Sequence, residues 1–543
     1  MASSVQDRSS DQQEIEWQFD AFDVRPVSRW LEGGACKNPS ISIGETREIS
    51  DTYLDTGDWR IYLAGYALRI RHTKGKSKAE ATMKLLASKT DAPGLRSRRE
   101  ISETLDSAEP EALKTSSGPV GKRVKSLIGP KALRPLFEVE TSRSTYGLNL
   151  DSSEVGEIAL DETAIPLEND AKPARIRRVE VEVEPEEVSR LELFVERLRD
   201  ECRLSPAIAS KYESGLFARE LTPPKSPEFG PTVVDGPLST GELAFRVLRK
   251  QFGVFLAHEP GTRIGEDPEE LHDMRVATRR MRAAMKIFEK AVPVRTQKFR
   301  SELKWVAGAL GEVRDLDVQL ERLDLWVSDA ELQDREPLEA LRAVLERQRE
   351  KYRRAMLRTL NSRRYAQLVE SFGEFLRCGP SRRTQASRQP ILDAGPDLVR
   401  KPHRKVRKLG DQLTKESSGE KYHELRKKGK RLRYALEFVS DIYRDPAKDL
   451  VKSLKKLQDV LGEHQDAEVA ASRLRELSAV RGCSPTLPPE TVFVMGGIAH
   501  RYETQAWELR KKIPKAYRRI KGKRWKNLEG TMEKRRPEET REA

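Results

Sequence analysis

The segment HDMRVATRRMR, residues 272–282, determines how the second half of the chain is interpreted. Its cationic positions His272, Arg275, Arg279 and Arg282 are spaced three, four and three residues apart. On a helix this spacing places all four side chains in one stripe. The apolar residues beside that stripe are expected to face a core, and they are Leu271, Met274, Met281, Met285 and Phe288.

A second segment, HELRKKGKRLR at 423–433, repeats the pattern with His, Arg, a basic residue and Arg in the same places. It begins 151 residues after the first (423 − 272). The segments LGEVRDLDV at 310–318 and LGEHQDAEV at 461–469 keep that offset (461 − 310). An offset shared by two motifs predicts two copies of one helical unit, packed about a pseudo-twofold axis.

Two interpretations of the basic stripes are open. A basic face on an amphipathic helix is usually solvated, and this is the favoured interpretation for an isolated run. However, like charges three and four residues apart repel each other, so stability alone would place glutamates between them. Arginine forks also suit phosphate oxygens, and a twofold axis would bring the two stripes to opposite sides of one groove. These features favour a surface that binds a flexible polyanion.

Length and charge limit the class of protein. The chain has 543 residues, 37% of them hydrophobic and 35% charged, and its formal net charge is +14. The length predicts two or three domains, and the charge favours a polyanionic partner such as nucleic acid, an anionic membrane or polyphosphate. Aromatic residues make up 6% and are not interleaved with basic ones, which argues against a platform for stacked single-stranded bases.

The cysteines and the first residues indicate an unexported protein with reduced thiols. Cys36, Cys202, Cys378 and Cys483 are scattered and form no CxxC pair, which argues against a zinc ribbon and a disulfide framework. Residues 1–17 contain no apolar signal segment, and no long uncharged apolar run occurs elsewhere. We therefore expect a cytoplasmic protein that does not enter a membrane. The sequence indicates no oligomeric state.

The first 220 residues show the alternation of strands rather than the period of helices. Proline, glycine, serine and threonine are then concentrated in LTPPKSPEFGPTVVDGPLSTGE, the best linker candidate, after which the helical period begins. The alternating segments are EIEWQF (14–19), ALRIR (67–71), EATMKLL (80–86), REISETL (99–105), LFEVETS (136–142), EIALDE (157–162) and RRVEVEVE (177–184).

The charged faces of these strands carry paired residues. Alternate residues of a strand share a face, so Glu14 lies beside Glu16, and Glu180 beside Glu182. Such carboxylate pairs can bind a hard divalent cation through oxygen, and the arginine pair of ALRIR could hold a phosphate chain. A sheet closed with its charges inward would be a polar tunnel, whereas an open sheet would expose them to water. Alternation alone favours the open sheet.

The two basic segments and the two LGE segments together resemble the CHAD domain, the conserved-histidine α-helical domain, over about residues 237–526. The resemblance implies a pair of four-helix bundles with a basic central groove that binds inorganic polyphosphate. The contact residues that it implies are His272, Arg275, Arg279, Arg280, Arg282, His423, Arg426, Lys430, Arg431 and Arg433. For the two histidines, a structural hydrogen bond and direct phosphate contact are equally open.

The acidic residues of the LGE segments also belong to that family pattern. Asp315, Asp317 and Asp466 are expected to be ion-pair partners that orient the arginines, because bare carboxylates would repel phosphate.

The ordered set EIEWQF, TYLDTGDWRIYLAGYALRIR, TMKLL, LRSRREIS, LFEVETSR, IALDE, VEVEVE and SKYESGL resembles the CYTH domain of the triphosphate tunnel metalloenzymes over about residues 14–219. The resemblance implies a closed antiparallel tunnel that binds Mg²⁺ or Mn²⁺ and hydrolyses short phosphate chains, including inorganic and thiamine triphosphate. The implied metal ligands are Glu14, Glu16, Glu140, Asp161, Glu180 and Glu182. The implied phosphate-binding residues are Arg69, Arg71, Lys84, Arg143 and Lys211.

One residue departs from the family signature ExExK. The chain has Glu14-Ile15-Glu16-Trp17-Gln18, so a glutamine occupies the lysine position. Glutamine donates a hydrogen bond but adds no charge to a developing oxyanion, and losing one such stabiliser costs about 10²–10³ in rate. The departure questions the rate of catalysis more than binding.

The predicted fold is therefore α+β in two domains: an antiparallel β tunnel or barrel with flanking helices, then an all-α domain of duplicated four-helix bundles. The expected function is metal-dependent hydrolysis of inorganic triphosphate, with the helical domain binding polyphosphate or docking on polyphosphate granules. The alternatives are a catalytically weak polyphosphate-binding scaffold and, less favoured, a nucleic-acid binder. The predicted segments are a disordered N-terminus (1–13), the tunnel (14–219), a linker (220–236), the helical domain (237–526) and a frayed basic tail (527–543).

Overall fold

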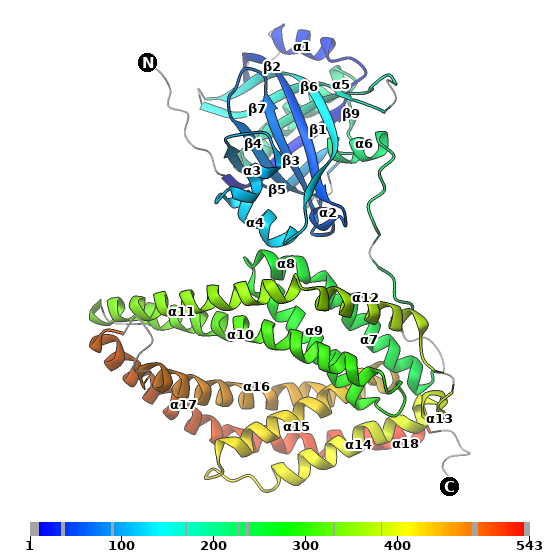
Figure 1. Cartoon of the computed structure of the whole chain (residues 1–543), viewed down its shortest axis with the longest axis vertical. Helices are drawn as coiled ribbons and strands as arrows, with labels where there is room; N and C mark the ends of the chain where they lie inside the picture. Colours follow the sequence, from blue (N-terminus) through cyan, green and yellow to red (C-terminus); the bar gives the residue numbers. More distant parts are fainter. Residues whose placement is uncertain are drawn as a thin grey trace. The chain divides into compact units, whose positions relative to one another are not determined.

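Figure 1 shows the computed structural model of the chain, which forms two compact units, Met1–Pro227 and Glu228–Ala543. The first is an antiparallel β barrel with short helices and the second is helical, which confirms the predicted fold class. The structure describes residues 10–33, 38–87, 92–151, 153–168, 171–225, 227–233, 238–329, 332–381, 383–479 and 487–536.

The sheet of the first unit closes on itself. Its strands follow the order β5-β4-β3-β2-β6-β7-β8-β1, and β1 pairs with both β8 and β5, so the ring has no open edge; the short β9 adds to β1. The strands are β1 (Ser10–Asp20), β2 (Ser40–Thr56), β3 (Tyr66–Thr73), β4 (Ala79–Leu85), β5 (Leu95–Leu105), β6 (Leu133–Leu150), β7 (Ser153–Ile165), β8 (Ala174–Val183) and β9 (Ser205–Pro206).

Closure puts opposite environments on the two faces of each strand. On β1, Trp17 and Phe19 are buried in an apolar cluster with residues of helices α1 (Arg25–Glu32) and α5 (Val188–Glu201), which cover the outside of the barrel. The polar residues that alternate with them, Glu14, Glu16 and Gln18, point into the barrel instead. The barrel is thus closed, as the resemblance implies, and not the open sheet that alternation alone favours.

The remaining helices of this unit sit at the ends of strands. α6 (Lys211–Ala218) begins with a capping box, in which the Ser210 hydroxyl accepts from the Glu213 amide and the Glu213 carboxylate accepts from the Ser210 amide. Such a cap fixes the first turn of a helix and so fixes the place of Lys211. The others are α2 (Arg60–Leu63), α3 (Pro110–Thr115), α4 (Pro119–Ile128) and the 3₁₀ helix η1 (Pro185–Glu187).

The helical unit repeats its elements. Helix α9 (Pro268–Ile287) and helix α15 (Gly419–Phe438) lie 151 residues apart at both ends and carry the two basic segments. The other helices are α7 (Thr240–Ala257), α8 (Glu259–Ile264), α10 (Thr296–Asp329), α11 (Leu332–Leu360), α12 (Arg363–Cys378), α13 (Gln385–Arg388), α14 (Ile391–Gly410), α16 (Ser440–Ala479), α17 (Pro489–Lys521) and α18 (Lys523–Lys534).

One apolar core serves both copies. It joins Met274 and Met281 of α9 to Leu425 and Leu432 of α15, and all four side chains are buried. α9 contacts α15 directly. The shared core holds the two basic helices against each other, with the polar sides of both available to a common surface.

Two boundaries differ from the sequence prediction. β1 starts at Ser10 because its first residues pair with β5, so the strand begins before position 14. α18 continues to Lys534, where Leu528 and Met532 are buried, so the tail is helical well beyond 527. The rest of the expected disordered N-terminus (1–9) and the last residues of the expected tail (537–543) lie outside the described residues.

Candidate active site in the tunnel and candidate anion surface

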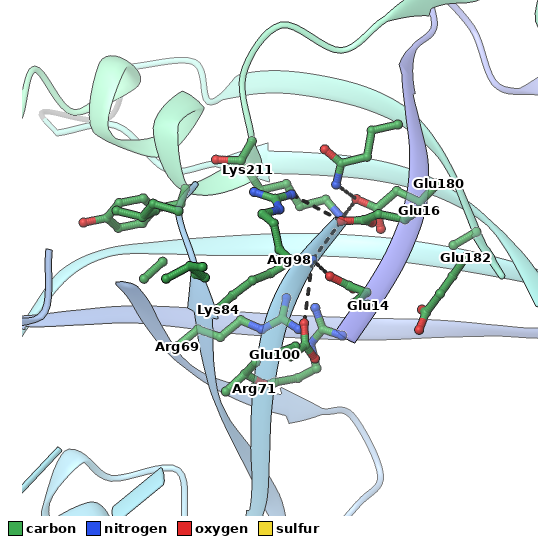
Figure 2. A pocket seen from close by; sticks show the side chains of 18 of the residues that line it. Glu14, Glu16, Arg69, Arg71, Lys84, Arg98, Glu100, Glu180, Glu182 and Lys211 are labelled. Atoms are coloured by element: carbon green, nitrogen blue, oxygen red, sulfur yellow. Dashed lines mark hydrogen bonds and ion pairs between the residues drawn. The ribbon is translucent and has the colours of Figure 1, made fainter. Parts of the chain in front are cut away.

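The barrel encloses a polar cavity of about 170 Å³ (Figure 2). Alternate residues of β1, β3, β4, β5, β6 and β8 point into it. Nine of the predicted site residues line it: Glu14, Glu16, Arg69, Arg71, Lys84, Arg143, Glu180, Glu182 and Lys211.

Lys84 lies at the centre of the carboxylates on one side of the cavity. Its Nζ atom pairs with Glu14, lies 2.8 Å from Oε1 of Glu16 and lies 3.6 Å from Oε2 of Glu100. Nη2 of Arg98 donates to the same Glu16 oxygen over 3.2 Å. A single ammonium group thus serves three carboxylates contributed by β1 and β5.

A second ion-pair cluster joins β6, β7, β8 and the start of α6. Arg143 donates to Asp161 over 2.8 and 2.7 Å and also to Glu180. Lys211 contacts Asp161 and lies 3.0 Å from Glu180. Nε2 of Gln18 is 3.5 Å from the same Glu180, while its Oε1 is buried without a hydrogen-bond partner.

The two arginines of β3 share one buried acid. Arg71 donates to both oxygens of Asp51 over 2.7 and 2.9 Å, and Arg69 lies 3.7 Å away. Burial alone would raise the pKa of Asp51, but the charges of Arg71 and Arg69 outweigh it and hold the pKa below its usual range. Asp51 therefore stays ionised and fixes the direction in which the two guanidinium groups point.

The cationic side chains of the cavity do not keep all of its carboxylates ionised. Burial, with the neighbouring carboxylates, raises the pKa of Glu14 to about 8 and that of Glu182 to about 7. Burial also disfavours ionisation of Glu16 and Glu180, yet the adjacent lysines and arginines lower the pKa of both. Two carboxylates thus hold a proton near neutral pH for want of another cation.

The donor set fits a hard divalent cation. Mg²⁺ and Mn²⁺ prefer carboxylate oxygens, and the cavity offers Glu14, Glu16 and Glu182 on adjacent strands β1 and β8. Within the described residues, no three metal-binding side chains converge tightly enough to hold an ion as they stand. The Lys84 ammonium group lies among these carboxylates and balances their charge, as a metal ion would.

Two predicted metal ligands lie elsewhere. Glu140 is exposed and does not line the cavity, because it is an odd number of residues from Arg143 and so points to the opposite face of β6. Asp161 is fully buried behind the lining, where it pairs with Arg143 and Lys211. Asp161 therefore orients the Arg143 and Lys211 side chains, and Glu140 faces the outside of the barrel.

Five charged residues of the site were not predicted: Asp51, Glu80, Arg98, Glu100 and Glu157. Arg98 and Glu100 alternate in LRSRREIS and so share the inward face of β5, a signal that the sequence contains. Asp51 has no such signal, since its importance comes from pairing with arginines on the next strand.

The basic stripes of α9 and α15 come together in the helical unit. Arg280 of α9 donates to Glu437 of α15 over 2.9 Å. Burial, then the charges of Arg426 and Arg279, lowers the pKa of Lys430 to about 7. Burial and the neighbouring arginines of both helices thus favour loss of the Lys430 proton near neutral pH.

Five arginines of the two basic segments have an unpaired Nε donor. Their inner Nε atoms are buried without a hydrogen-bond partner in Arg279, Arg280, Arg282, Arg426 and Arg433. A buried donor left unpaired costs about 1–3 kcal/mol. Acceptors on a bound anion would remove that cost. On a simply solvated basic face, water would pair these donors and the cost would not arise.

Other predicted contact residues differ among themselves. Arg431 is exposed, while Arg275 is partly buried and lies 3.6 Å from Asp315. His423 has its Nδ1 atom 2.6 Å from Oε1 of Gln465, which is a structural hydrogen bond. Burial, with the charge of Arg314, lowers the pKa of His272.

The aspartates of the LGE segments mainly join the two copies. Asp315 lies 3.4 Å from Arg473, and Asp466 lies 3.3 Å from Arg322, so the two pairs are related by the 151-residue offset. Asp317 instead pairs with Arg349 of α11. Only Asp315 also contacts a stripe arginine directly.

None of the helices in the described part of the chain is long and apolar enough to cross a membrane.

Comparison with known proteins identifies both units. A CYTH-domain model matches residues 36–211, and a CHAD-domain model matches residues 246–475. Two uncharacterized proteins of Mycobacterium tuberculosis are each 24% identical over 290 residues, which are 53% of this chain and 54% of theirs. The chain thus spans about half the length of these curated relatives.

Solved structures resemble each unit separately. The CHAD domain of the plant Ricinus communis is 24% identical and covers 53% of this chain and 94% of its own, with a TM-score of 0.45. PptA from Streptomyces chartreusis is 20% identical and covers 52% and 100%, with a TM-score of 0.42. A Hippeastrum protein described as an adenylyl cyclase with a dominant triphosphatase activity is 20% identical and covers 38% and 96%, with a TM-score of 0.30. From the two matched models, the chain carries a CYTH domain followed by a CHAD domain.

Proposed function

We propose that the tunnel hydrolyses inorganic triphosphate or a related short phosphate chain, and that the helical unit binds inorganic polyphosphate. The observation that carries the enzymatic half is the composition of the cavity, where six cationic side chains and seven carboxylates line one space. Cations on several strands suit a ligand with charge along its length. Carboxylates in the same space would only repel that ligand unless they also serve a cation or a reacting water.

The cations act on the phosphate chain. Arg69 and Arg71, held by Asp51, bind oxygens at one side of the cavity, and Arg143 and Lys211 bind them at another. A cavity carboxylate accepts a proton from water as the water oxygen bonds to the terminal phosphorus. The bond from that phosphorus to the bridging oxygen breaks, which yields orthophosphate and pyrophosphate. The fixed cations stabilise the charge that develops on the phosphoryl oxygens.

Glu14, Glu16 and Glu182 would hold the Mg²⁺ or Mn²⁺ ion. When bound, the ion adds charge stabilisation of the phosphoryl oxygens that side chains alone do not supply.

Phosphate release from triphosphate with Mg²⁺ or Mn²⁺ tests this function. We expect Glu14→Ala/Glu16→Ala to lower the rate by at least about 10²-fold, because it removes two carboxylates from the centre of the cavity. Glu140→Ala is the matched control: it deletes a β6 carboxylate that faces outward and leaves the rate unchanged. No activity in the parent protein, or equal activity in all three, would contradict the proposal.

The polyphosphate half rests on the five arginines of the two basic segments whose buried Nε atoms lack a hydrogen-bond partner. Long polyphosphate, including chains packed in granules, offers acceptors in a flexible form. Arg279→Glu/Arg426→Glu is expected to abolish binding of fluorescent long-chain polyphosphate. Nucleic acid added at equal phosphate concentration should compete poorly, and ready displacement by it would assign this surface to nucleic acid.

A non-catalytic scaffold is the second candidate, and Gln18 favours it. The glutamine lies in the cavity 3.5 Å from Glu180, where the family signature has a lysine. If the tunnel is a scaffold, the parent protein is inactive and Gln18→Lys creates activity. If it is an enzyme, the parent is active and the same change raises its rate by about tenfold or more.

A further inference from the structure

The two basic helices carry opposite charges at two positions of the repeat: Glu270 corresponds to Lys421 (421 − 270 = 151) in the first turn, and Lys286 corresponds to Glu437 near the C-terminal end. Along the two stripes, matching positions of α9 and α15 carry like charges except at the second of these positions (437 − 286 = 151). The matching cationic pairs are Arg275 with Arg426, Arg279 with Lys430, Arg280 with Arg431, and Arg282 with Arg433.

Glu437 contacts cations of both copies. Its Oε2 accepts from Nη2 of Arg280 over 2.9 Å, and its Oε1 lies 3.6 Å from Nε of Arg433. The side chain of Glu437 is only 18% exposed. Its counterpart Lys286 is 52% exposed and pairs with Glu289, three residues further along the chain.

A carboxylate in this position resembles a bound phosphate. It is an anion between two guanidinium groups that come from different helices, the arrangement expected for a phosphate of a bound chain. It also withdraws Arg280 and Arg433 from any other ligand and repels negative charge nearby. Stability of one helix does not require it, because the corresponding place in α9 carries the opposite charge.

We propose that Glu437 is an internal competitor that closes one end of the basic surface and limits its affinity for phosphate chains. This inference rests on the proposed polyphosphate binding. A chain that reaches this end displaces the Glu437 carboxylate from Arg280 and Arg433, whereas no such displacement is needed at Lys286. The basic surface is consequently asymmetric, although the helices that build it are copies.

The test is titration of the full-length Glu437→Gln variant with fluorescent long-chain polyphosphate at several salt concentrations. We expect binding about tenfold tighter than the parent. Because one or two further cations become available, the dependence of log affinity on log salt should steepen by about one charge. Glu424→Gln is the matched control, since it removes a carboxylate of the same helix that pairs with Lys427 and Lys428.

The opposite change should act in the opposite direction. Lys286→Glu places a carboxylate at the corresponding end of α9, and we expect weaker binding and a shallower salt dependence.

Weaker binding by Glu437→Gln would show that the carboxylate orients Arg280 and Arg433, and would overturn the inference. Equal gains in Glu437→Gln and Glu424→Gln would reduce the effect to net charge and overturn it too. Absence of binding in the parent and in Arg279→Glu/Arg426→Glu alike would instead refute the proposed polyphosphate function.

Discussion

Lys84 is the shared counter-ion of three carboxylates in the tunnel, and the Lys84→Met variant tests how much this ion pairing stabilises the fold. The substitution keeps the length of the side chain but removes the ammonium shared by Glu14, Glu16 and Glu100, whose side chains are 10%, 4% and 16% exposed. Breaking a buried ion pair by deleting one partner costs about 3–5 kcal/mol. Because Arg98 still contacts Glu16, we expect the lower end, about 3 kcal/mol.

The loss should appear in thermal unfolding of the tunnel. For a domain of this size, about 3 kcal/mol corresponds to a Tm lower by about 10 °C. Mn²⁺ should raise the Tm of Lys84→Met more than that of the parent protein, because the carboxylates then lack their internal cation and gain more from a bound ion. Binding of triphosphate should weaken in the same variant.

Lys78→Met is the matched control, since Lys78 is exposed directly before β4, the strand that carries Lys84. It should melt like the parent. If Lys84→Met melted like Lys78→Met, or if Mn²⁺ raised the Tm of all three proteins equally, Lys84 would not be the counter-ion of the cavity.

Two further predictions concern pH. The pKa of Lys430 is near 7 and rises when phosphate binds, so binding above pH 7 takes up a proton. Polyphosphate affinity should therefore fall as the pH rises from 7 to 9. Lys430→Arg should make the affinity less dependent on pH, and an unchanged pH dependence in this variant would contradict the role given to Lys430. Burial lowers the pKa of His403, whose ring stacks on Trp525 at 3.4 Å, to about 4. The unfolded chain therefore binds the proton more readily, so the helical unit should lose about 3 kcal/mol of stability between pH 6.5 and 4; denaturant unfolding of His403→Phe should lack most of that loss.

Strand alternation placed most of the tunnel residues correctly on one face. Glu14, Glu16, Glu180 and Glu182 line the cavity because inward and outward positions alternate without interruption on β1 and β8. The same rule argues against Glu140, which the family resemblance implies but which is out of phase with Arg143 on β6.

Contacts between strands that are distant in the sequence could not be predicted from strand alternation. Asp51 reads as an ordinary strand residue, and only the pairing of β2 with β3 brings it to Arg71. Asp161 lies directly opposite Arg143 in the β6–β7 register, which the sequence does not specify.

The repeat of the helical unit could be predicted from the sequence because one offset links both motifs. The contacts between copies could not be, since they depend on how the two helix pairs cross. Asp315 pairs with Arg473 and Asp466 pairs with Arg322 across that interface, so these two aspartates join the copies. The prediction that they serve chiefly to orient the stripe arginines holds geometrically for Asp315 alone.

The most direct test of the central claim is a ³¹P NMR time course of full-length protein with inorganic triphosphate and Mg²⁺ or Mn²⁺. Attack at the terminal phosphorus predicts that triphosphate disappears as orthophosphate and pyrophosphate accumulate in equal amounts, and that Glu14→Ala/Glu16→Ala stops the change. A spectrum that stays constant with the parent protein, or products that form equally fast with the double variant, would contradict the account.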